Sequence, residues 1–177
     1  MEELRAGSTY LFTLAAVSTT FVGFASLFMA FKQDITGTMT KFDIMLTKNH
    51  FLLSFMVVAA SMYPPLLHLF PYVPDDTIWR MSSILAAIPP FAFAVTYPSR
   101  RFRASGVRMP TGTKVILAFL YLTVLILLLN VSGDPISSGP GLYALGLTVE
   151  QFTNIGAFIY ALRFVLDTPA TPEQLAN

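Results

Sequence analysis

A carboxylate stands in the middle of the last long hydrophobic run of the chain, from Gly141 to Leu166. Glu150 is followed by Gln151 and Asn154, and no basic residue lies within two helical turns of it. The centre of a bilayer offers neither water nor counter-ions, so an unpaired ionised side chain there costs roughly 2.5 to 3.5 kcal/mol or more. We therefore expect Glu150 to be protonated, hydrated or ion-bound, and to face a protein interior or a water-filled path.

Two hypotheses account for this carboxyl group. In the first, Glu150 binds a cation or a proton along a conducting path through the membrane. In the second, it is a structural group that is hydrogen-bonded between helices or between subunits. The sequence leaves both open. Glu150 and Asn154 are four residues apart and share one face of a helix, whereas Gln151 begins a neighbouring face.

Other polar side chains fall at a similar depth when residues are counted inward from the expected helix ends at ~1.5 Å per residue. Hydroxyl groups of the first and fourth hydrophobic runs belong to this set. In the first run the same region also carries a stripe of small residues, for which ordinary helix packing is the favoured explanation. The predicted polar layer consists of Thr19, Thr20, Thr123, Glu150, Gln151 and Asn154.

Two proline pairs interrupt the second and third hydrophobic runs, Pro64-Pro65 and Pro89-Pro90. Each proline removes a backbone donor, so both helices should kink. Counted from the turn between the two runs, both pairs fall at about 15 Å from the outer side. The carbonyls that they free need a neighbour, water or an ion. Helix shape is the favoured role for both pairs, and binding of a lipid or small ligand there is the alternative.

The sequence offers few groups for catalysis or metal binding. There is no cysteine, and no motif of a metalloprotease, serine hydrolase, nucleotide-binding loop or dinucleotide fold occurs. His50 and His68 stand at positions roughly 27 Å apart along an ideal helix, so one chain cannot bind a single metal ion with both. We expect both histidines at the membrane interfaces, and we predict no enzyme activity, no metal site and no cofactor.

Composition assigns the chain to the integral membrane proteins. Of 177 residues, 54% are hydrophobic and 12% are charged, against about 25% charged residues in typical soluble domains. The apolar residues cluster in continuous runs near the ~20 residues that a membrane helix needs. A net charge of +1 argues against a nucleic-acid partner.

The predicted fold is an all-α membrane bundle of about five transmembrane helices, forming a single domain over residues 1–166. The connections include a turn at Pro74–Thr77, bracketed by Tyr72 and Trp79 as interface anchors. A stretch before the second span, Thr38–Lys48, fits an amphipathic surface helix or an extension of that span. Residues 167–177 are expected to form a short disordered cytoplasmic tail. The spans are predicted at residues 8–31, 48–72, 79–99, 114–132 and 141–166.

The distribution of basic residues predicts the orientation. If the N-terminus lies outside, every lysine and arginine except Arg5 and Arg80 lies on the inner side, as the positive-inside rule requires. We therefore expect the N-terminus outside and the C-terminus in the cytoplasm. One loop, predicted at residues 100–113, concentrates this charge and should set topology and contact anionic lipid headgroups. Its arginines are Arg100, Arg101, Arg103 and Arg108.

Short motifs in the first hundred residues resemble a loose group of small, uncharacterised bacterial inner-membrane proteins. They are Thr20-Phe-Val-Gly-Phe24, the Phe42-Asp43 pair and Trp79-Arg-Met-Ser-Ser83, followed by the arginine-rich segment. The resemblance implies a multi-pass protein of the bacterial inner membrane and carries no activity to transfer.

The leading functional hypothesis from the sequence is a small homo-oligomeric channel or pore-like protein for a cation or a proton, with Glu150 as its charged element. A single copy of five helices leaves little room for a sealed pathway, so conduction is expected at a subunit interface. The alternative is a non-conducting scaffold or accessory subunit of a larger membrane complex. An axial ring of Glu150 carboxylates would favour the pore, whereas burial inside each subunit would favour a structural role.

Overall fold

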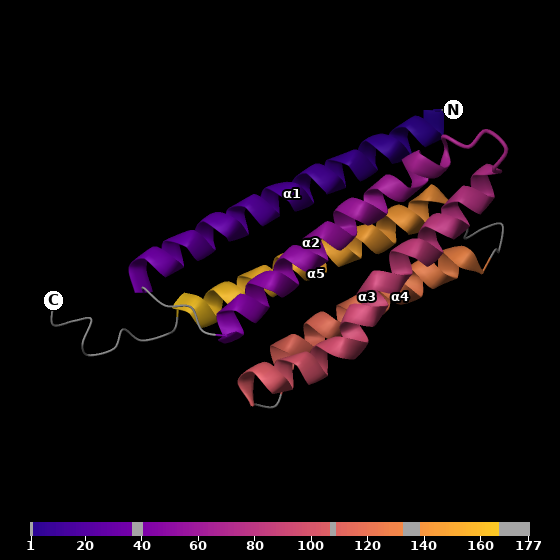
Figure 1. The fold of residues 1–177 in the computed structure, drawn as a ribbon. Coiled ribbons are helices and arrows are strands. Elements are labelled where there is room, and N and C mark those ends of the chain that lie inside the picture. Colours follow the sequence, from indigo (N-terminus) through magenta and orange to yellow (C-terminus); the bar gives the residue numbers. More distant parts are fainter. Residues whose placement is uncertain (1, 37–40, 107–108, 133–138, 167–177) are drawn as a thin grey trace, which may run out of the picture.

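The computed structural model describes residues 2–36, 41–106, 109–132 and 139–166. The described residues form five helices with short turns at some of their ends, which confirms the predicted all-α fold with five helices. The helices run alternately up and down in one elongated bundle (Figure 1). Their bounds are α1 Glu2–Thr36, α2 Lys41–Leu67, α3 Asp75–Ser105, α4 Thr111–Val131 and α5 Pro140–Leu166.

Helix α5 is the central element of the bundle. It packs against α1, α2 and α4, and also touches α3. The outer helices contact fewer partners: α1 packs on α2 and α5, and α3 packs on α2 and α4. The last of the described helices is therefore the one that contacts all the others.

Four of the five described helices are long and apolar enough to cross a membrane: Gly7–Phe31 within α1, Ile44–Leu67 within α2, and the whole of α3 and α4. Helix α5 has the length but not the hydropathy, since Glu150, Gln151 and Asn154 stand in its middle. The four helices fit a multi-pass membrane protein.

The connection between α2 and α3 lies earlier in the chain than predicted. Helix α2 ends at Leu67 rather than near residue 72, and α3 already begins at Asp75. The turn predicted at Pro74–Thr77 is therefore wrong. Pro74 is the N-cap of α3, and Asp75 and Asp76 lie in its first turn, where the helix dipole favours negative charge.

The arginine-rich segment is also helical rather than a loop. Arg100, Arg101 and Arg103 belong to the last turns of α3, which stops at Ser105. Gly106 adopts a left-handed conformation with φ of 67° and donates its N–H to the carbonyl of Phe102, the usual way to end a helix. Arg108 lies outside the described residues, as does the predicted tail of residues 167–177.

Between α1 and α2, the second helix begins at Lys41. The described part of the Thr38–Lys48 segment therefore extends the second span and is not a separate surface helix. This extension, the end of α3 and the start of α4 lie at the same end of the bundle (Figure 1). We call it the basic end, because Lys48, Arg100, Arg101, Arg103 and Lys114 lie there. The opposite end holds the α2–α3 connection and the start of α5.

The interior contains two hydrophobic clusters. One gathers near the opposite end around Trp79, Leu127, Tyr143 and Leu147. The other lies near the basic end around Leu53, Phe93, Tyr97 and Leu120. Trp79 was predicted to anchor the membrane interface, and that prediction is wrong: only 4% of its surface is exposed, and its ring centroid lies 5.7 Å from that of Tyr143.

The two proline pairs occupy different places in their helices. Pro64 and Pro65 lie in the last turn of α2, whereas Pro89 and Pro90 lie near the middle of α3. The prediction that both pairs lie equally deep is therefore wrong, because α2 ends earlier than its apolar run. Pro64 has no N–H to offer the carbonyl of Ala60, and the hydroxyl of Tyr143 donates to that oxygen instead, at 2.6 Å. A neighbouring helix thus satisfies a carbonyl that the proline leaves open.

Candidate functional site

Glu150 lies inside the bundle, on the central helix. Only 1% of its surface is exposed, and it ranks among the largest fully buried side chains of the described structure. Neither carboxyl oxygen has a hydrogen-bond partner among the residues that the structure describes. Buried polar groups in proteins are normally hydrogen-bonded, so an orphaned carboxyl group points to a bound proton, water or ion.

The two amides that accompany Glu150 are buried and tie α5 to its neighbours. Gln151 accepts a hydrogen bond at Oε1 from the hydroxyl of Ser18 on α1. Asn154 donates from Nδ2 to the hydroxyl of Ser54 on α2, at 2.7 Å. Each amide keeps one atom without a partner among the described residues, Nε2 of Gln151 and Oδ1 of Asn154. Buried polar atoms are normally hydrogen-bonded, so these atoms call for a further partner such as water.

Thr123 on α4 is the third polar group that the structure brings to this level. Helices α4 and α5 are antiparallel, and their register is fixed by close approaches on both sides of Glu150. A Cβ on Gly146 would lie 2.9 Å from Leu127, and a Cβ on Gly112 would lie 2.5 Å from Tyr160. This register puts Thr123 level with Glu150. Thr123 is fully buried, and its hydroxyl has no partner in the described part of the chain.

Thr19 and Thr20 do not join the layer. Both are exposed on the outer face of α1, and their hydroxyls donate to carbonyls of the same helix, those of Ala15 and Ala16, at 2.9 Å. The inward-facing hydroxyl is that of Ser18, one residue earlier. Successive residues of a helix point about 100° apart, so an error of one residue changes the face.

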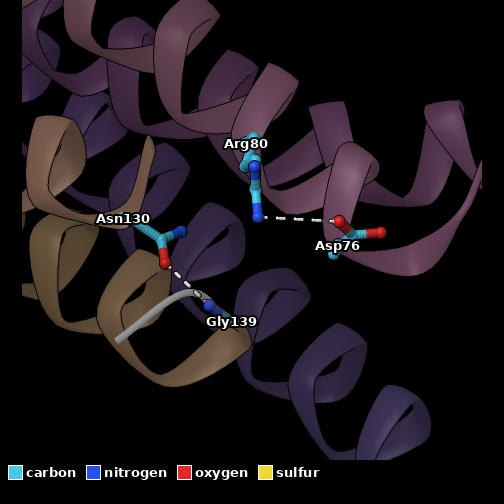
Figure 2. Close-up of polar contacts among 4 residues, drawn as sticks. All are labelled: Asp76, Arg80, Asn130 and Gly139. Atoms are coloured by element: carbon cyan, nitrogen blue, oxygen red, sulfur yellow. Dashed lines mark hydrogen bonds and ion pairs between the residues drawn. The ribbon is translucent and has the colours of Figure 1, made fainter. Parts of the chain in front are cut away.

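A second polar cluster lies near the opposite end and was not predicted. Asn130 of α4 is fully buried, donates to the hydroxyl of Ser83 on α3 at 2.8 Å, and accepts the N–H of Gly139 at 2.7 Å. Figure 2 shows Asn130 directed at Gly139, with the Asp76–Arg80 ion pair nearby on α3. An asparagine at the end of an aliphatic run was the sequence signal for it.

The two histidines differ in their surroundings. His50 is buried between helices: its ring lies 4.9 Å from that of Phe158, and it stands beside Asn154 and the backbone of Phe21. Its place at a membrane interface stays a prediction. Neither ring nitrogen has a hydrogen-bond partner of good geometry among the described residues. His68 is half-buried near the opposite end, with Nδ1 3.9 Å from a carboxylate oxygen of Asp75.

At the basic end the arginines point in different directions. Arg101 is buried and donates to the hydroxyl of Tyr97 at 3.3 Å. Arg100 places its guanidinium carbon 4.9 Å from the centre of the Phe93 ring, a cation–π contact. Arg103 is exposed to the surroundings. The described residues contain no group of three or more His, Cys, Asp or Glu that could hold a metal ion.

Taken from one end to the other, buried polar groups follow the length of the bundle. They begin with Arg101, Asn49 and His50 near the basic end, continue through Asn154, Gln151 and Glu150, and finish at Asn130. Most of the middle of this series is carried by α5. Comparison with known proteins adds no relative, because no family model, no curated protein and no solved structure matches the chain.

Proposed function

We propose that this protein is a multi-pass protein of the bacterial inner membrane that carries protons or a small cation through the interior of each subunit, with Glu150 as the binding group. The observation that carries the proposal is the burial of Glu150 on the central helix, with both carboxyl oxygens unpartnered among the described residues. A carboxyl group that is rare and costly in a membrane is by default a functional candidate.

The charge distribution supports the proposed orientation. Lys48, Arg100, Arg103 and Lys114 lie near the basic end, where α3 stops and α4 starts. The positive-inside rule puts such an end in the cytoplasm, which leaves the N-terminus outside and the end of α5 inside.

The position of Glu150 changes where the path would run. A pore along a subunit interface needs the carboxylate on an outward face of the subunit. Glu150 instead lies on the inward face of α5, buried within a single bundle. The proposed path therefore follows the buried polar groups inside one chain. Association of several copies through their apolar outer faces remains a separate part of the proposal, and conduction does not depend on it.

The same burial favours a second candidate, a non-conducting scaffold or accessory subunit of a larger membrane complex. A carboxyl group enclosed within each subunit, near two amides that join helices, is what a structural role would produce. The two candidates differ in what the neutral, isosteric variant Glu150→Gln should do.

Flux through purified protein in liposomes separates the candidates. Under a potassium diffusion potential, the wild type should move protons or a monovalent cation, read by an internal pH dye or by ion uptake, and Glu150→Gln should abolish the flux. Thr19→Ala, a change on the exposed face of α1, should leave it intact. Unchanged flux in Glu150→Gln would reject a conducting role for Glu150. Absence of flux in the wild type, with altered stability or assembly in the variant, would favour the accessory subunit.

A further inference from the structure

A small cavity opens at the basic end between α2, α3, α4 and α5. Its volume is about 50 Å³, which exceeds what one water molecule needs. Polar side chains from three helices line it among apolar ones: Asn49 and His50 from α2, Tyr97 and Arg101 from α3, and Thr113 from α4. It lies at the basic end of the series of buried polar groups, apart from Glu150, and binding there can be measured without any flux.

The polar lining is rich in hydrogen-bond donors. Asn49 is 7% exposed and His50 is 5% exposed. The Nδ2 of Asn49 has no hydrogen-bond partner among the described residues. The ring of His50 lies beside the Asn154 side chain and the backbone of Phe21, without a hydrogen bond of good geometry to either. The guanidinium of Arg101 keeps its positive charge in any protein environment and suits the planar recognition of phosphate or carboxylate. Donors and a cation together favour an oxyanion.

A second, apolar hollow begins on the other side of His50. It lies between α1, α2 and α5, has a volume of about 30 Å³, and is lined mainly by hydrophobic residues such as Phe28, Met29 and Leu162. His50, Leu46 and Ala161 line both spaces. A mostly apolar cavity with a few donors in its wall adjoins an apolar hollow, and together they match a molecule with a charged head and a hydrocarbon chain.

We propose that the basic end binds an anionic phospholipid, whose phosphate oxygens accept hydrogen bonds from Arg101, Asn49 and His50 while part of an acyl chain lies along the apolar hollow. With the basic end in the cytoplasm, the site faces the leaflet in which anionic lipids meet basic residues. A free phosphate ion shares the headgroup chemistry, but it has no hydrocarbon chain and would leave the apolar hollow empty.

Lipid retention by the purified protein tests this site. In detergent micelles with equal amounts of phosphatidylglycerol and phosphatidylcholine, native mass spectrometry should show phosphatidylglycerol retained about tenfold or more in preference, as charge-assisted hydrogen bonds predict. Arg101→Met should remove the preference. Arg103→Met is the matched control, because it deletes the same charge from an exposed position two residues away, and it should keep the preference.

Asn49→Leu tests the site with little change of shape and stands in if Arg101→Met fails to fold. It replaces the unpartnered donor amide with an apolar side chain, so phosphatidylglycerol retention should fall while the unfolding temperature without added lipid stays close to that of the wild type. Equal retention of both lipids by the wild type would overturn the proposal. So would equal behaviour of folded Arg101→Met and Arg103→Met, or displacement of the lipid by inorganic phosphate at an equal concentration.

Discussion

Helices α4 and α5 lie side by side, but they differ in how many polar side chains stand in their middle. Helix α4 is almost wholly aliphatic and turns residues such as Leu125 and Leu128 outward, each about half exposed. Helix α5 carries a carboxylate and two amides in its middle, yet it is the helix that touches all the others. The less apolar of the two is thus the more enclosed by protein.

In a helical membrane bundle, the hydropathy of a helix reflects how much of its surface would face lipid rather than protein. A helix that faces lipid must be apolar on its outer side, since lipid cannot satisfy polar groups. A helix that packs against several others presents part of its surface to protein, and polar side chains on that part find partners there, as Gln151 does on Ser18 and Asn154 on Ser54. Helix α5 has a lower hydropathy than the candidate spans because Glu150, Gln151 and Asn154 stand in its middle, on the part that packs against other helices.

The largest expected effect distinguishes the two faces of α4. Leu127→Ala should lower the free energy of unfolding by about 2 to 5 kcal/mol, because it leaves a cavity in the core. Leu127 is fully buried, whereas Leu125, two residues earlier, is 54% exposed. Leu125→Ala should change the unfolding free energy far less. Steric-trapping measurements in bicelles compare the two, and equal losses would mean that the outward face of α4 is also buried, for instance between copies.

A smaller effect is expected where α5 satisfies the backbone of α2. Tyr143→Phe leaves the Ala60 carbonyl without the donor that replaces the N–H missing from Pro64, so stability should fall by about 1 to 3 kcal/mol. Tyr121→Phe on the exposed face of α4 is the control and should be close to neutral. If the two variants unfold alike, the hydroxyl of Tyr143 contributes nothing to the end of α2.

The smallest measurable effect concerns the Asn154–Ser54 bond between α5 and α2. Hydrogen bonds between membrane helices average about 0.6 kcal/mol, so a double-mutant cycle of Asn154→Ala and Ser54→Ala should give a coupling of that order. The same cycle with Thr20→Ala in place of Ser54→Ala should show no coupling, since Thr20 bonds to its own helix. Coupling in both cycles would contradict the assignment of faces on α1.

Much of this architecture could be predicted from the sequence. Continuous apolar runs identified five helices, and the carboxylate and amides of α5 were recognised as one group that Thr123 joins at the same level. The sequence did not show how each helix is rotated about its own axis, and so it did not show which face of the helix is buried. Thr19 and Thr20 were assigned to the interior, but Ser18 occupies it, because the partners of α1 decide which face is buried.

Burial near the helix ends was the other feature that the sequence could not fix. Trp79 and His50 were expected at the membrane interfaces because they stand near the ends of apolar runs. Helix α2 extends beyond its run toward the basic end, and α3 extends beyond its run in both directions, so both residues lie inside the packed bundle. Polar residues such as Asp75 and Arg101 continued these helices, which an apolar count cannot detect.

The central place of α5 also has a consequence for biogenesis. Its partners Ser18, Ser54 and the carbonyl of Ala60 belong to α1 and α2, which leave the ribosome first, whereas α5 follows after all the other described helices. Those groups are therefore synthesised before their partners on α5, and the packing of the described bundle is completed only when α5 is added.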